Sequence, residues 1–146
     1  MVKHDFEVQT KWQGGREEVG SVNGDVISEH ISIPAPLGGN GTGTNPDELL
    51  VAAASSCYII SLAATLERAK FTNINLTIKT IGTALFENGK FKMDKITHYP
   101  SITVSSDEKS TLEKRLPKLL TIADNNCMIS NSIRNNVTID IQPTIE

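Results

Sequence analysis

The sequence has few cysteines, few aromatic residues and no large excess of charge of either sign. Its 146 residues include 2 cysteines, 1 tryptophan and 5% aromatic residues, and its formal net charge is -3 at pH 7. The N-terminal stretch MVKHDFEVQTKW is charged and lacks the apolar run of a signal peptide. Two widely separated cysteines in such a chain do not make a structural disulfide framework. A bond between Cys57 and Cys127 would therefore belong to the chemistry of the protein.

The distribution of charge and apolar residues narrows the class of protein further. Acidic and basic residues are interspersed, so the basic patch that nucleic acid or an anionic membrane attracts is missing. The apolar stretch 49–64 is interrupted by serines and falls short of the roughly 18 uninterrupted apolar residues of a membrane span. We expect a soluble, cytoplasmic protein with no nucleic-acid or membrane partner, folded as one domain over residues 1–146.

Turn signals and alternating apolar residues predict two β-hairpins. The first has strands at 4–12, 16–22 and 25–33, with a hairpin turn at Asn23-Gly24. A segment rich in proline and glycine, PAPLGGNGTGT, follows; it lacks the spacing and lysine of a phosphate-binding loop and predicts a flexible connector. The second hairpin joins strands 73–87 and 90–106 at Asn88-Gly89, and a last strand covers 137–142.

Helices separate and follow the hairpins, which makes an α+β fold. Asn45 is a predicted cap, Pro46 suits the first helical position, and Glu48 stands where a carboxylate reaches free backbone donors. The helix is apolar on nearly every side up to Leu66, so other elements must cover it all round, which indicates a partner subunit. A second helix should kink or break at Pro117, before a short helical turn at 130–136.

The two cysteines allow two interpretations. Free cysteine is often buried as a small apolar side chain, and Cys57 lies in the middle of an apolar helix. Cys127 follows a helix end among polar residues, which is a poor place for a core-filling side chain, and precedes a short helix whose free N–H groups would stabilise a thiolate. The composition leaves open whether the two thiols meet.

Three separated motifs resemble the OsmC/Ohr family of organic hydroperoxide reductases. GTNPDELLVAAASSCYIISLA is similar to the motif in which T-N-P-E precedes the helix of the peroxidatic cysteine. CMISNSIRNNVTID is similar to the second motif, commonly C-P-Y-S-N-A-T-R-G-N, and WQGGREEVG to an N-terminal glycine-glycine-arginine segment. The resemblance covers essentially the whole chain and implies the OsmC/Ohr-like fold, with β-hairpins and sheets around long central helices in an intertwined homodimer.

The resemblance implies a role for four residues. Cys57 stands at the position of the peroxide-attacking thiolate, and Cys127 at that of the resolving cysteine. Arg16 matches an arginine beside the reactive sulfur; a guanidinium there favours the thiolate and stabilises the leaving alkoxide. Asp47 matches a glutamate that orients the arginine. Aspartate is one methylene shorter, so whether Asp47 or Glu48 anchors Arg16 stays open, and Asp47 alternatively only complements the helix N-terminus.

Two further points concern the assembly and the second motif. Asp47 and Cys57 are ten positions apart, or about 15 Å along a straight helix. The two residues can share an active site only from different subunits, which agrees with the implied homodimer.

CMIS replaces C-P-Y-S and removes a rigid turn and a hydroxyl, so the preferred substrate and reductant stay open. Ser130, Asn131 and Arg134 match the rest of the motif, either in a supporting role or, for Ser130, in helix capping.

The implied activity is a cysteine-dependent peroxidase of the oxidative stress response. Cys57 attacks an organic hydroperoxide and becomes a sulfenic acid, and Cys127 condenses with it to form a redox-active disulfide. A dithiol, in the family a lipoyl group on a carrier protein, regenerates the thiols without metal or bound cofactor. One alternative is a non-catalytic module that binds a lipid-like molecule on the same fold. A metal site built from the cysteines and His4, His30 or His98 lacks the usual ligand spacing.

Overall fold

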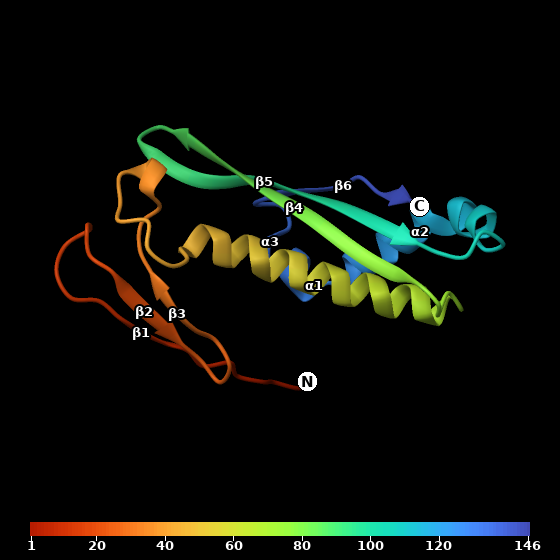
Figure 1. Ribbon diagram of the computed structural model, residues 1–146, viewed down its shortest axis with the longest axis horizontal. Helices are drawn as coiled ribbons and strands as arrows, with labels where there is room; N and C mark the ends of the chain where they lie inside the picture. The colour runs from red at the N-terminus through yellow and green to blue at the C-terminus, as the bar shows by residue number, and fades with distance from the viewer. The chain divides into compact units, whose positions relative to one another are not determined.

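The computed structural model describes residues 1–146, which form two compact units, Met1–Leu49 and Leu50–Glu146. The first unit contains a small sheet and a glycine-rich connection, and the second contains a larger sheet with the helices (Figure 1). The order of the elements confirms the predicted α+β class. A 3-10 turn and a short last strand add to the predicted elements.

The first unit is a three-stranded antiparallel sheet with a folded connection after it. β1 (Gln9–Lys11), β2 (Gly20–Asn23) and β3 (Ser28–Ile31) pair in chain order and are shorter than predicted. The connection contains η1 (Ala35–Leu37), and Thr44 forms a bridge with Ile31 of β3. The segment predicted as a flexible connector is therefore tied to the sheet by backbone hydrogen bonds.

The two Asn-Gly pairs behave differently. Asn88 and Gly89 have φ of 54° and 76° and connect β4 to β5 as the predicted two-residue turn. At the first hairpin Asn23 pairs with Ser28, so the loop has four residues and begins at Gly24. The predicted hairpin forms, but a two-residue turn at Asn23-Gly24 does not, because neither residue adopts the positive φ that this turn requires.

Helix α1 (Pro46–Arg68) begins with the predicted cap. The side chain of Asn45 accepts a hydrogen bond from the backbone N–H of Glu48 at 2.8 Å, which satisfies one free donor of the first turn. The carboxylate of Glu48 accepts from the hydroxyl of Thr44 rather than from a backbone donor. By length and composition α1 is also apolar enough to cross a membrane, although the core helix of a soluble protein meets the same criterion.

The second unit is built on a long hairpin. β4 (Asn75–Glu87) pairs antiparallel with β5 (Lys90–Thr103), and β6 (Thr138–Ile141) and β7 (Thr144–Ile145) pair parallel with the other edge of β5. Figure 1 shows the hairpin in green running alongside α1. Gly82 of β4 permits this approach, because a Cβ at that position would collide with the side chain of Val51 in α1.

The core of the second unit lies between the sheet and two helices. Buried leucines of α2 (Lys109–Asn125) pack against the inner face of α1 and against Ile102 of β5. α2 runs unbroken through Pro117, so the predicted break does not occur. A proline inside a helix costs about 3 kcal/mol, and the burial of Leu112, Leu116, Leu119 and Leu120 offsets that cost. α3 (Met128–Ile133) follows after a short connection.

One face of α1 is left uncovered in the single chain. Tyr58, Leu62 and Leu66 are fully buried, whereas Ile60 is 70% exposed. An apolar groove beside Ile60 is lined by Ile59, Ala63, Ile74 and Leu76. The single chain therefore leaves part of α1 uncovered, and its coverage by a partner subunit stays a prediction.

A histidine is buried in this core. His98 of β5 is completely buried, and its ring stacks on Tyr58 with centroids 4.8 Å apart. Its Nδ1 is hydrogen-bonded to Thr80 Oγ1 at 2.9 Å, while Nε2 has no partner. Burial lowers the pKa of His98 below its usual 6.5, and the nearby Asp124 offsets only part of this effect.

We predict that the protein loses stability as the pH falls below about 6.5, the ordinary pKa of histidine. Below that pH the unfolded chain binds a proton at His98 that the folded protein binds only at lower pH, so acid favours unfolding. Urea unfolding near neutral pH and near pH about 5.5 measures the loss. His98→Gln should lose less free energy of unfolding between the two conditions, and an equal loss in both proteins would contradict the assignment.

Candidate active site at the two cysteines

Cys57 lies in the middle of α1 at the wall of a cleft. Its thiol is half-buried, and the cleft has a volume of about 460 Å³. The helix contributes a row of residues one turn apart, and the segment around α3 contributes the opposite wall; the lining residues are Cys57, Ile60, Ser61, Ala64, Arg68, Asn126 and Met128. The helix side of the cleft therefore combines the apolar Ile60 and Ala64 with the polar Ser61 and Arg68.

Cys127 occupies the capping position of α3, directly after the end of α2. The predicted position between the two helices is confirmed, but the side chain is completely buried and belongs to the main apolar core. The expectation that this junction is a poor place for a core side chain is wrong. The chain turns inward here because α2 ends at Asn125 and the following residues fold back across its C-terminus.

The structure brings the two thiols together. Cys57 packs against the cluster that contains Cys127, so the two thiols lie near each other. Burial raises the pKa of the Cys127 thiol above its usual value, and the neighbouring Cys57 thiol raises it further. The hydroxyl and backbone amide of Ser130 lower this pKa in part. The site thus pairs a thiol open to the cleft with a thiol that is shielded from solvent.

Ser130 is a buried polar group that lowers the pKa of the Cys127 thiol. The residue is 1% exposed, and its hydroxyl has no hydrogen-bond partner. A serine hydroxyl can donate to a thiolate, so Ser130 is available to stabilise Cys127 when that residue ionises. The geometry favours this use over the alternative in which Ser130 caps a helix, because Ser130 lies inside α3.

Arg16 and Asp47 lie in the first unit, and the cysteines lie in the second. The guanidinium of Arg16 donates to the backbone oxygen of Leu37 at 3.4 Å and lies against Gly38. Asp47 is exposed in the first turn of α1. The roles assigned to both residues therefore stay predictions, and so does the choice between Asp47 and Glu48 as the anchor of Arg16.

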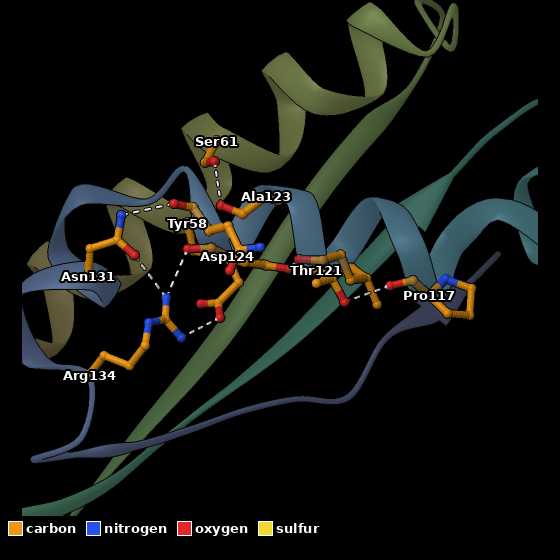
Figure 2. A network of polar contacts seen from close by, with 10 residues as sticks. Tyr58, Ser61, Pro117, Thr121, Ala123, Asp124, Asn131 and Arg134 are labelled. Atoms are coloured by element: carbon orange, nitrogen blue, oxygen red, sulfur yellow. Dashed lines mark hydrogen bonds and ion pairs between the residues drawn. The ribbon is translucent and has the colours of Figure 1, made fainter.

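Several polar residues near the cysteines were not identified from the sequence. Asp124 forms an ion pair with Arg134 at 2.8 Å, and Ser61 of α1 donates to the backbone oxygen of Ala123 at 2.6 Å (Figure 2). The sequence could have indicated Ser61, because it lies four residues after Cys57 and therefore on the same face of the helix. No three histidine, cysteine or acidic side chains gather as a metal site in the chain.

Comparison with known proteins places the chain among relatives of its own length. It is 36% identical to the uncharacterized protein YmaD of Bacillus subtilis over 100% of this chain and 97% of that protein. It is 26% identical to peroxiredoxin OsmC of Escherichia coli, over 92% of this chain and 93% of that protein. An OsmC-like protein of unknown function from Vibrio cholerae has the same fold, with a TM-score of 0.76 and 20% identity over 99% and 100% of the two chains.

The family comparison covers the end of the first unit and nearly all of the second. Residues 39–142 match the OsmC-like protein family, and this range includes both cysteines. The match supports a soluble protein with α1 as a core helix, and a redox role related to peroxide reduction. The protein therefore belongs to the OsmC-like family, as its three motifs predicted.

Proposed function

We propose that the protein is a thiol-dependent peroxidase that reduces organic hydroperoxides to alcohols. The observation that carries the proposal is the contact between the cleft-facing Cys57 and the buried Cys127 in a chain of the OsmC-like family. A peroxidatic thiol must meet the substrate, whereas a resolving thiol must meet only the oxidised partner. The exposures of the two cysteines match these two requirements.

The first step takes place at Cys57. Its thiolate attacks the terminal oxygen of the hydroperoxide, the O–O bond breaks, and the alkoxide takes a proton and leaves as the alcohol. Cys57 becomes a sulfenic acid, which is a two-electron oxidation of its sulfur. The apolar wall formed by Ile60 and Ala64 favours the organic part of such a substrate over hydrogen peroxide. Arg16, oriented by Asp47 or Glu48, is proposed to stabilise the thiolate and the leaving oxygen.

The second step uses Cys127. Its thiolate attacks the Cys57 sulfur, the S–S bond forms, and hydroxide leaves and is protonated to water. A dithiol then reduces the disulfide by exchange. We propose a lipoylated protein as its source, because a lipoyl group is a dithiol on a long arm. The protein acts in the cytoplasm in this proposal, where thiols are kept reduced.

A homodimer completes the proposal. The apolar face of α1 around Ile60 and Ala63 needs a cover that the single chain does not supply. A second copy offers the same face and is self-complementary. Asp47 and Cys57 are about 15 Å apart along one continuous helix, so a site that uses both residues draws them from two subunits.

We predict that Cys57→Ser abolishes peroxidase activity and that Cys127→Ser stops it after one turnover. Serine at 57 lacks a nucleophilic thiolate, whereas loss of Cys127 leaves the sulfenic acid unresolved. Cumene hydroperoxide and hydrogen peroxide are supplied in turn with dihydrolipoamide, and the remaining peroxide is assayed. Wild-type consumption no faster than free dithiol would reject the peroxidase and favour the lipid-like binding module.

We predict that disulfide formation accelerates with rising pH. Cys127 must be deprotonated to attack, and its raised pKa keeps it protonated near neutrality. The thiolate fraction then grows about tenfold for each pH unit below the pKa. Single-turnover mixing with cumene hydroperoxide, followed by alkylation of free thiols and mass spectrometry, gives the rate. A rate that stays constant between neutral and alkaline pH would contradict this role for Cys127.

We predict that Ala63→Glu converts a dimer into a monomer. A carboxylate in the apolar groove beside Ile60 loses its hydration when a partner covers it, which costs several kcal/mol in real proteins. Sedimentation analysis of wild type, Ala63→Glu and the exposed control Lys79→Glu measures the assembly. A monomeric wild type, or a variant that still dimerises, would contradict the proposed interface.

A further inference from the structure

The C-terminus of α2 is capped by three different parts of the second unit. The last four carbonyl groups of a helix have no partner within it and need donors from elsewhere. Here each of the four carbonyl oxygens accepts a hydrogen bond. The carbonyl of Ile122 accepts from the backbone N–H of Asn126, and that of Ala123 accepts from the hydroxyl of Ser61. The carbonyl of Asp124 accepts from Arg134 and from the backbone N–H of Cys127, and that of Asn125 accepts from the side chain of Asn131. Cys127 follows directly, so these bonds define where its backbone lies.

Arg134, at the end of α3, makes three hydrogen bonds at this helix end. One arm of its guanidinium donates to the carboxylate of Asp124 at 2.8 Å, and the other donates to the Asp124 carbonyl at 3.2 Å and to the side chain of Asn131 at 3.0 Å. Figure 2 shows the guanidinium between Asp124 and Asn131. Cys127 lies between these two residues in the chain. The fork of Arg134 therefore closes the short segment that carries the buried cysteine.

Ser61 ties the other cysteine to the same helix end. It lies one turn after Cys57 on α1 and donates to the Ala123 carbonyl of α2 at 2.6 Å. Tyr58, which follows Cys57, donates more weakly to Leu120 of α2 at 3.4 Å. Both cysteine-bearing segments are thus attached to the last turns of α2, one from each side.

We propose that Arg134 is a positioning residue for the resolving cysteine. Through Asp124 and Asn131 it holds the backbone of Cys127 where its sulfur can bond to Cys57. A disulfide requires Cα atoms within about 4.4–6.8 Å and a restricted dihedral angle, so a loosened segment presents Cys127 at a lower effective concentration. The proposal rests on the proposed function, because a resolving step is needed for this placement to matter.

The features of the Arg134 contact match a positioning role. The Asp124 side chain is 17% exposed and that of Arg134 is 37% exposed, so water screens the pair only in part. Hydrogen bonds with a charged donor and acceptor are short and directional, and a forked guanidinium fixes an angle as well as a distance. The second ion pair of the chain, Lys95 with Asp140 at 3.9 Å, is longer and more exposed and joins β5 to β6. It provides a matched control.

The first experiment measures the equilibrium between the dithiol and the Cys57–Cys127 disulfide without any peroxide. The full-length wild type, Arg134→Gln, Arg134→Lys and Lys95→Gln are equilibrated in glutathione buffers of varied ratio, alkylated and analysed by mass spectrometry. Loss of the charged fork should lower the equilibrium constant for forming the disulfide from the dithiol by about tenfold or more. Arg134→Lys, which keeps the charge and loses the fork, should fall between, and Lys95→Gln should match wild type.

The second experiment separates the two chemical steps. After mixing with cumene hydroperoxide, Arg134→Gln should form sulfenic acid at the wild-type rate, accumulate the dimedone-trapped adduct, and form the disulfide about tenfold more slowly. A lowered melting temperature with unchanged disulfide equilibrium and rate would show a purely structural role and overturn the proposal. Asn131→Ala removes one acceptor of the Arg134 fork together with the Asn131 bond to the Asn125 carbonyl, and gives a second test if Arg134→Gln does not fold.

The two proposals fail in different ways. A wild type that forms the disulfide in glutathione but does not consume hydroperoxide would count against the peroxidase alone. An active wild type whose disulfide equilibrium is insensitive to Arg134→Gln, Arg134→Lys and Asn131→Ala would overturn the positioning role alone.

Discussion

The burial of one face of α1 is the constraint on which the second unit depends. Tyr58, Leu62 and Leu66 have no exposed surface, and each buried side chain of this size contributes about 1.5–3 kcal/mol. This face fixes the rotation of the helix about its axis. Because Cys57 precedes Tyr58, the same rotation turns the Cys57 thiol toward Cys127 at the edge of the buried face. The packing that stabilises the fold thus also orients Cys57, the proposed reactive group.

The same core contains polar groups that ordinary packing would exclude. Tyr58, His98, Ser130 and Cys127 are all buried, and Nε2 of His98 and the hydroxyl of Ser130 have no hydrogen-bond partner. Burial raises the pKa of Tyr58 and of Cys127 and lowers that of His98, so each side chain is held in its neutral form. A neutral buried thiol is slow to react with solvent oxidants, since the thiolate is the reactive species. In the proposed mechanism, this keeps Cys127 unreactive until Cys57 has been oxidised.

The departure of the second motif from the usual C-P-Y-S has a structural counterpart. Met128 is 58% exposed and lines the cleft beside Cys57, whereas Ile129 packs against both apolar clusters. Met128 therefore changes the surface of the cleft that a substrate would meet. Ile129 changes the packing beneath the junction between α2 and α3. No proline restricts the backbone after Cys127, and in the proposed positioning role the Arg134 contacts hold that segment.

Local sequence determined the features that depend on a few neighbouring residues. The cap at Asn45, the turn at Asn88-Gly89 and the family motifs around the cysteines were predicted because backbone preferences act over short distances. Tertiary structure decided the burial of Cys127, the continuity of α2 through Pro117 and the Asp124–Arg134 contact. These depend on the free energy gained when distant segments pack, which can override a local preference and which no short stretch of sequence contains.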